Sequence, residues 1–171
     1  LAALQASGLA DETVVMFLSD HGMPMPFAKS SLYRNGIRTP WIVRWPGTVK
    51  PGSVCGQMVQ QTDFMATFAA MFGTTLPPDA GLDSYNILPL LTGESETSDR
   101  REIFYFSDDG DLTALRYNDW KAIFMEQKSE ATFRAWMDPF IPLRVPLILN
   151  LRRDPFERAP VTSNTYYDWL I

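Results

Sequence analysis

The chain has 171 residues, enough for one mid-sized domain with a single core. Apolar residues make up 46% and charged residues 20%, with 13 prolines and 10 glycines, which excludes a disordered or collagen-like chain. The formal net charge of −5, without any Lys or Arg run longer than two residues, argues against nucleic acid as a partner. The single cysteine, Cys55, can form neither an intramolecular disulfide nor a multi-thiolate zinc site.

The sequence contains no run that approaches the ~20 continuous apolar residues needed to span a bilayer. It lacks an initiator Met, and both ends resemble helices that continue, so we expect truncation at both ends. A signal peptide would then lie outside these residues, and its absence is no evidence for a cytoplasmic location.

The first half of the chain is expected to belong to a covered sheet. A helix over 1–10, closed by Gly8, precedes residues 13–18, a continuous β-prone apolar run typical of strands buried on both faces, often in parallel sheets. A second short strand is predicted over 41–45. The segment 62–73 begins with a Thr-Asp N-cap and ends in glycine, which predicts a helix, and 74–101 is expected to be mostly loop.

From residue 102 the pattern changes to short alternating strands joined by tight turns, which indicates an antiparallel meander. Strands are predicted over 103–107, 112–117 and 120–126, with turns at Asp109-Gly110 and Asn118-Asp119, then over 147–151 after the proline-rich passage 139–146, before a terminal helix capped by Ser163-Asn164. We therefore expect an α/β part over 1–98 and an antiparallel subdomain over 99–171.

The dipeptide Asp20-His21 is the leading candidate for chemistry. It follows the strand predicted over 13–18, and ligands gather at the carboxyl ends of strands in open α/β sheets. A carboxylate beside an imidazole is a normal ligand pair for a divalent cation, and His21 is the only histidine in the chain. Two ligands do not make a site, so a structural turn is the alternative interpretation.

Seven stretches stand out by their order and spacing: 17–22 (FLSDHG), 27–29 (FAK), 36–47 (GIRTPWIVRWPG), 61–63 (QTD), 81–93 (GLDSYNILPLLTG), 114–121 (ALRYNDWK) and 149–157 (LNLRRDPFE). Together they resemble the sulfatase family of the alkaline-phosphatase-like superfamily. Most of the chain is similar to bacterial arylsulfatases, and the stretch near Lys29 is similar to sulfamidase-like members. The resemblance implies an α/β fold, in which the last part of an alkaline-phosphatase-like sheet domain is followed by a small C-terminal antiparallel sheet with a helix.

The resemblance also assigns roles to three residues. Asp20 matches an aspartate that binds the active-site divalent metal, usually Ca²⁺, and His21 falls where most sulfatases have a metal-binding Asn. Related phosphatases and phosphonate hydrolases have Asp-His at this place, so Mn²⁺ and Zn²⁺ are alternatives to Ca²⁺. Lys29 matches a catalytic basic residue that contacts the sulfate group and would stabilise its negative charge. A solvated loop lysine is the alternative interpretation of Lys29.

The resemblance implies a nucleophile that this sequence does not contain. Sulfatases attack with a formylglycine made from Cys or Ser in a Cys/Ser-x-Pro-x-Arg motif, and that motif is absent from the 171 residues. Cys55 has neither the Pro nor the Arg, and we expect it to be a small buried or turn residue. The chain alone should therefore be inactive. For the intact protein, the resemblance implies a sulfated small molecule or glycan as substrate and a periplasmic or secreted location.

Two further charged motifs have simpler explanations. The stretch 108–111 lacks the ligand spacing and the closing Glu of a calcium-binding loop, so a hairpin turn explains it. The pairs Arg100-Arg101 and Arg152-Arg153 flank strands, where solvated or ion-paired roles are expected rather than a grip on an anionic substrate.

Three functions stay open at this point. The first is a sulfuric ester hydrolase, and the second is a phosphoryl or phosphonate ester hydrolase of the same superfamily, which Asp20-His21 favours. The third is a non-catalytic carbohydrate-binding or interaction module. The presence or absence of the nucleophile motif in the full-length protein would separate them.

Overall fold

The computed structural model describes residues 1–23, 31–127 and 137–158. They form two compact units: the first comprises Leu1–Leu18 and Trp41–Arg101, and the second comprises the described parts of Ser19–Pro40 and Glu102–Ile171. The segment that carries Asp20 and His21 thus groups with the C-terminal strands. The expected boundary between residues 98 and 99 stays a prediction. No helix among the described residues is both long and apolar enough to cross a membrane.

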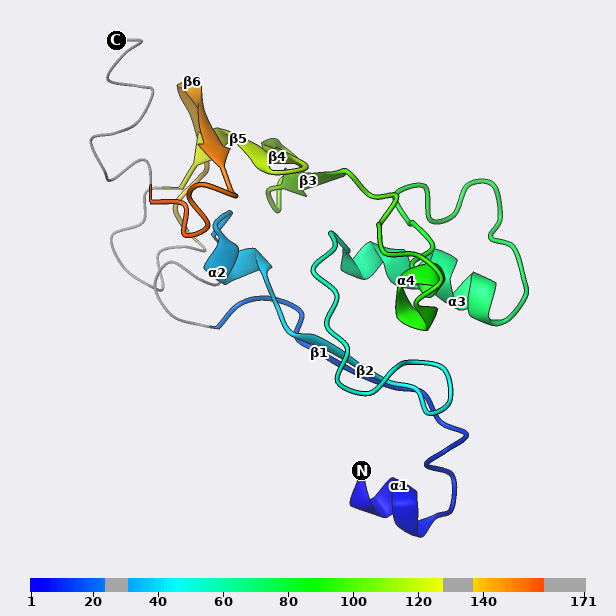
Figure 1. Cartoon of the computed structure of the whole chain (residues 1–171). Coiled ribbons are helices and arrows are strands. Elements are labelled where there is room, and N and C mark those ends of the chain that lie inside the picture. The colour runs from blue at the N-terminus through cyan, green and yellow to red at the C-terminus, as the bar shows by residue number, and fades with distance from the viewer. Residues whose placement is uncertain (24–30, 128–136, 159–171) are drawn as a thin grey trace. The chain divides into compact units, whose positions relative to one another are not determined.

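The first unit contains a two-stranded sheet. Strand β1 (Val15–Leu18) pairs with β2 (Trp41–Arg44) in antiparallel register (Figure 1). Phe17 lies opposite Ile42, and the two side chains are 62% and 60% exposed. The strands lie where the sequence predicts them, but the expected burial on both faces is wrong for the described residues, and the pairing of β1 with β2 is antiparallel although such runs are often found in parallel sheets. An apolar run indicates a tendency to be buried and does not fix the direction of the neighbouring strand.

Helices accompany the sheet in this unit. The short helix α1 (Ala2–Ala6) ends before Gly8, whose φ of +76° is readily adopted only by glycine, as expected. The 3₁₀ turn η1 (Gln61–Asp63) leads into α3 (Phe64–Met71). Gln60 is the N-cap of η1, where the Asp63 side chain accepts a hydrogen bond from the Gln60 backbone N–H, and Asp63 rather than Thr62 is the N-cap residue of α3.

A further helix, α4 (Leu88–Thr92), lies beside α3 in a stretch expected to be loop (Figure 1). Proline stands in its first turn, and Gly93 ends it with a left-handed φ of +83°. Proline near the start and glycine just past the end are a normal helix signal, so this short helix could have been found from the sequence.

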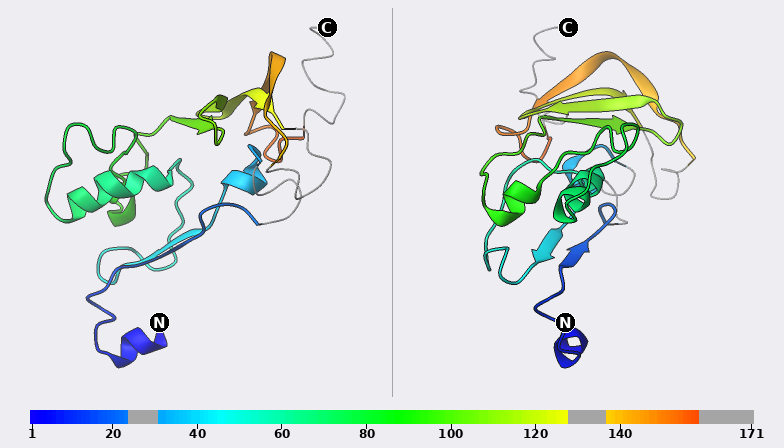
Figure 2. Two further views of the ribbon diagram at one scale, coloured as in Figure 1. Left: turned by 180° about the vertical axis from the view of Figure 1, so that it is seen from behind. Right: turned by 90° about the vertical axis from the view of Figure 1, so that its right-hand side faces the viewer.

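The second unit contains the antiparallel meander. Figure 2 shows its four strands side by side, and they are hydrogen-bonded in chain order. They are β3 (Glu102–Phe106), β4 (Leu112–Tyr117), β5 (Trp120–Glu126) and β6 (Ile141–Asn150). The expected tight turns are confirmed, since Gly110 and Asn118 have φ of +88° and +50° in the two hairpins.

Strand β6 begins earlier than the sequence predicts. The expected strand covers 147–151, but β6 begins at Ile141 and includes Pro142 and Pro146. Among the described strands it lies at the edge of the sheet, with β5 as its paired neighbour. Edge strands tolerate proline because only one side of the strand must supply N–H donors to a neighbour.

The core of the second unit lies on one face of this sheet. Ala114, Ile123 and Leu149 are buried there, and Leu32 and Tyr33 pack against them. The short helix α2 (Arg34–Ile37), which the sequence did not predict, follows these two residues and lies by the sheet in Figure 1. The sheet therefore supports the segment that follows the candidate metal ligands. The terminal helix expected after Ser163 lies outside the described residues.

Candidate functional site

Asp20 and His21 lie in the bend that follows β1, with their side chains together. Nε2 of His21 is 3.4 Å from Oδ2 of Asp20. The same carboxylate accepts a hydrogen bond from the His21 backbone N–H at 3.0 Å, and the Ser19 hydroxyl donates to the His21 carbonyl at 2.9 Å. The Asp20 side chain is 80% exposed and that of His21 40%, so both are accessible to a ligand.

The other ring nitrogen of His21 fixes the tautomer. Nδ1 lies 2.7 Å from the Gly22 carbonyl oxygen, which can only accept a hydrogen bond. An N–H at Nδ1 donates to this carbonyl, which leaves Nε2, on the side of Asp20, as the ring nitrogen that a neutral imidazole would offer to a metal. A ligating histidine is commonly oriented in this way, by a carbonyl bonded to its second nitrogen. One carboxylate and one such imidazole fit a divalent cation.

These two donors do not complete a metal site. Among the described residues, no group of three or more His, Cys, Asp or Glu side chains is placed to hold a metal ion. Lys29, the expected sulfate contact, lies outside the described residues. Cys55 is exposed rather than buried, and it belongs to the other unit.

Gly22 packs tightly against α2. Its N–H donates to the Gly36 carbonyl at 2.8 Å. A Cβ at Gly22 would lie 1.9 Å from the Asn35 carbonyl oxygen, a distance that no real contact reaches. Only glycine therefore fits, and the bend with Asp20 and His21 is held directly against this helix.

The helix is in turn held by a buried ion pair that the sequence analysis missed. Nζ of Lys121, on β5, lies 2.6 Å from Oε1 of Glu157, and both residues are buried. The same ammonium donates to the Leu32 carbonyl, and the second Glu157 oxygen accepts from the Arg34 backbone N–H. The pair therefore joins the sheet to the segment that leads into α2.

Aromatic rings line this ion pair. The ammonium of Lys121 lies 5.6 Å from the ring centre of Tyr33 and 5.2 Å from that of Tyr105. Burial lowers the pKa of Lys121, and the Glu157 carboxylate opposes that shift. Burial raises the pKa of Tyr105 to about 12. The pKa of Tyr33 is also raised to about 12, mainly by burial and to a smaller extent by the Glu126 carboxylate.

The backbone of Glu157 is also unusual. Its φ is +53°, in the left-handed region that residues with a side chain rarely adopt, at a cost of about 1 kcal/mol or more. Lys121 and Glu157 end the matched stretches 114–121 and 149–157, so the sequence held a signal for both. The alternation of β5 could not show that a lysine faces the core.

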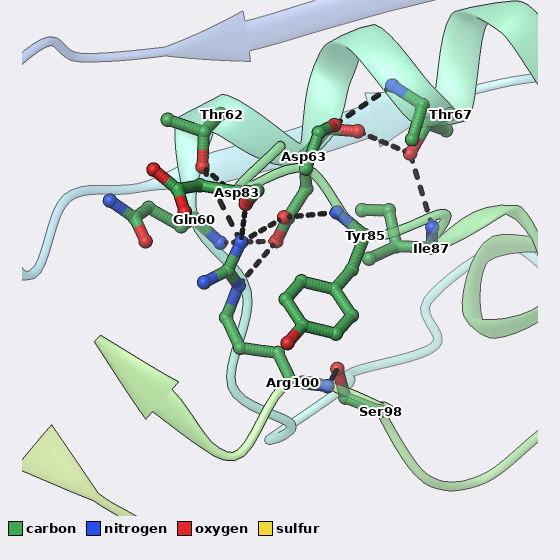
Figure 3. Close-up of polar contacts among 11 residues, drawn as sticks. Gln60, Thr62, Asp63, Thr67, Asp83, Tyr85, Ile87, Ser98 and Arg100 are labelled. Atoms are coloured by element: carbon green, nitrogen blue, oxygen red, sulfur yellow. Dashed lines mark hydrogen bonds and ion pairs between the residues drawn. The ribbon is translucent and has the colours of Figure 1, made fainter. Parts of the chain in front are cut away.

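A second buried ion pair lies in the first unit (Figure 3). Oδ1 of Asp63 is 2.5 Å from Nη2 of Arg100, and the two side chains are almost fully buried. The carboxylate also accepts from the backbone N–H groups of Gln60 and Tyr85, at 2.8 and 3.0 Å, and Arg100 donates to the Asp83 carbonyl. The ion-paired role expected for Arg100 is confirmed. This pair joins the start of α3 to the loop that contains Asp83 and Tyr85.

Comparisons with known proteins define the family. Residues 20–121 match the family model described as N-sulphoglucosamine sulphohydrolase, C-terminal, and residues 98–170 match the C-terminal region of aryl-sulfatase. The chain belongs to the sulfatase family, in the alkaline-phosphatase-like superfamily, as the sequence motifs indicate.

Individual relatives agree with this assignment. The chain is 30% identical to steryl-sulfatase of Mus musculus, over 95% of the chain and 31% of the relative, and 33% identical to N-acetylgalactosamine-6-sulfatase of Homo sapiens, over 95% and 36%. The fold superposes on the PsFucS1 sulfatase from Pseudoalteromonas sp. with a TM-score of 0.80 at 24% identity, over 98% of the chain and 36% of that protein. The chain thus spans about a third of the length of these relatives.

Proposed function

We propose that the full-length protein containing this chain is a sulfatase that hydrolyses sulfate esters or N-sulfates. The single observation that carries the proposal is the match of residues 20–121 to the family model described as N-sulphoglucosamine sulphohydrolase, C-terminal. At the start of that region, Asp20 Oδ2 and His21 Nε2 lie 3.4 Å apart, with the His21 ring oriented by the Gly22 carbonyl. This pair lies in the region matched by the sulphohydrolase family model, which supports a role in the reaction.

Within this proposal, Asp20 and His21 supply one oxygen and one nitrogen ligand to a divalent cation. A cation bound there would stabilise negative charge on the sulfate oxygens. Ca²⁺ is the first candidate for the ion, with Mn²⁺ and Zn²⁺ as the alternatives that an imidazole ligand favours. The attacking formylglycine would lie outside the 171 residues, which lack its motif, and the described residues bring no third His, Cys, Asp or Glu side chain to this pair.

The proposed substrate class is a sulfated glycan or a sulfated small molecule. The names of the matched family and of the human relative both refer to amino sugars. The steryl-sulfatase relative supports the broader class. An assay of the full-length protein against an aryl sulfate, an N-sulfated amino sugar and a 6-O-sulfated amino sugar would rank them.

Replacing Asp20 by Asn should nearly abolish turnover in the full-length protein. A hard cation would lose its anionic oxygen ligand, so the dissociation constant for Ca²⁺ should rise with the loss of rate. Steady-state kinetics on an aryl sulfate and calorimetric titration of the metal-free protein measure both effects. Unchanged metal affinity and rate would remove Asp20 from the site.

Replacing Lys29 by Ala should lower kcat by roughly 10²-fold or more, as for the loss of one preorganised electrostatic donor. The ammonium would stabilise charge that develops on the transferring group, so the effect should fall on kcat. Lys29→Arg, which keeps the charge, should recover part of the rate. Thermal melts control for folding, and full activity in Lys29→Ala would make it a solvated lysine.

A second candidate function is hydrolysis of phosphate or phosphonate esters. It is favoured by His21, which stands where the resemblance to sulfatases leads us to expect Asn. The same full-length protein should be assayed against an aryl phosphate, a phosphodiester and a phosphonate ester. A higher kcat/KM on any of these than on the aryl sulfate would replace the sulfatase proposal.

A further inference from the structure

The buried pair Lys121–Glu157 is far from Asp20 and His21 in sequence, yet a short series of contacts within one unit joins it to their bend. The pair binds the backbone of the segment that leads into α2, through the Leu32 carbonyl and the Arg34 N–H. Both groups belong to the main chain, so the pair fixes the path of the backbone and not only a side chain.

The loop that carries Glu157 makes a further contact with the same helix. Nη1 of Arg34 donates to the Pro155 carbonyl at 3.0 Å, and Pro155 stands two residues before Glu157. The start of α2 is therefore attached to this loop through both its backbone and its first side chain.

The loop with Glu157 holds α2, and the bend with Asp20 and His21 packs against this same helix. Gly22 donates to the Gly36 carbonyl at 2.8 Å and has no room for a Cβ beside Asn35. The Gly22 carbonyl in turn accepts from Nδ1 of His21 at 2.7 Å. A shift of α2 would therefore move the group that fixes the His21 ring.

We propose that Lys121 and Glu157 are positioning residues, which hold α2 and through it the orientation of His21 and Asp20. The inference rests on the proposed function, because it assumes that Asp20 and His21 bind the metal. The left-handed backbone of Glu157 supports it, since a strained conformation persists where surrounding contacts hold it, and here the carboxylate contacts both the Arg34 N–H and Lys121.

The test separates positioning from stability in the full-length protein. Glu157→Gln should raise the dissociation constant for Ca²⁺ by up to roughly tenfold, the lower end of the effect of losing a direct partner of a metal ligand, because Glu157 acts on His21 through α2. The double variant Lys121→Met with Glu157→Leu replaces the ion pair by apolar side chains, which commonly restores stability. It still lacks the bonds to Leu32 and Arg34. We expect its melting temperature to recover while Ca²⁺ affinity and kcat stay low.

Two further variants make the result decisive. Asp63→Leu with Arg100→Met is the matched control, because it removes the equally buried pair of the other unit and should leave Ca²⁺ affinity unchanged. Asp20→Asn tests the metal site itself. If Asp20→Asn leaves Ca²⁺ binding intact, the proposed function fails. If Asp20→Asn weakens binding but the Lys121/Glu157 double variant binds Ca²⁺ normally, the positioning role is overturned.

Discussion

The two buried ion pairs are alike in chemistry and differ in what they hold. Asp63 and Arg100 connect the start of α3 with a loop of the same unit, and the Asp63 carboxylate also accepts two backbone N–H groups. Lys121 binds the Leu32 carbonyl, which is 89 residues away in sequence, and Glu157 binds the Arg34 N–H, which is 123 residues away. The first pair stabilises the structure in which it lies, whereas the second fixes a segment next to the candidate metal ligands. Both pairs are therefore expected to contribute to stability, and only the second is placed to affect the geometry of the candidate site.

The largest effect that tests this difference is expected from Gly22→Ala in the full-length protein. The new Cβ would meet the Asn35 carbonyl and force the bend away from α2. We expect kcat to fall by roughly 10²-fold, as for a displacement of about 1 Å at a reacting site. Kinetics on an aryl sulfate measure the effect. Gly56→Ala is the control, since a Cβ there meets nothing within 4 Å. Equal rates in the two variants would contradict the contact.

The next test is Arg100→Met, which should affect stability alone. It leaves the buried Asp63 carboxylate without its charged partner and should lower the free energy of unfolding by about 3–5 kcal/mol. Chemical denaturation measures this loss, and Ca²⁺ affinity of the folded protein should not change. Arg101→Met, at the exposed neighbouring position, should change stability by no more than about 0.5 kcal/mol. A loss of Ca²⁺ affinity in Arg100→Met would erase the distinction between the pairs.

The smallest effect is a loss of stability at high pH, which comes from Tyr105, beside the Lys121–Glu157 pair. The pKa of Tyr105 is raised by burial to about 12, so its neutral form is favoured in the folded state. Its contribution to stability is complete below pH 10 and is lost as the pH rises from about 10 to about 12. Tyr105→Phe should therefore flatten the fall of stability over this range. Thermal melts against pH measure it, with Tyr117→Phe, at an exposed position, as the control.

Local patterns predicted the strands and turns well. The alternation over 102–126 and the Asp109-Gly110 and Asn118-Asp119 turns lead directly to the meander, because strand period and turn chemistry are local properties. The predicted start of β6 is too late because proline generally argues against a strand. Proline is tolerated in an edge strand, however, and the sequence does not state which strand lies at an edge. The apolar run at 13–18 indicated a strand but not the direction of its partner.

The candidate site was only partly visible in the sequence. The resemblance to sulfatases implies that Asp20 and His21 act together, whereas adjacency alone leaves a structural turn open. The Lys121–Glu157 pair and its hold on the segment before α2 are long-range contacts that no local pattern encodes. Lys121 occupies an inward-facing position of β5, whereas charged side chains usually lie on the protein surface.

The prolines of β6 have a consequence for association between copies of the protein. A ten-residue strand at a sheet edge is a place where a strand of another molecule could add. Pro142 and Pro146 carry no N–H donor, and Arg144 between them places a charge on the same strand. A strand from another copy would gain no N–H donor at these two positions and would have to desolvate that charge. Within the described part of the chain, these residues disfavour growth of the sheet at β6.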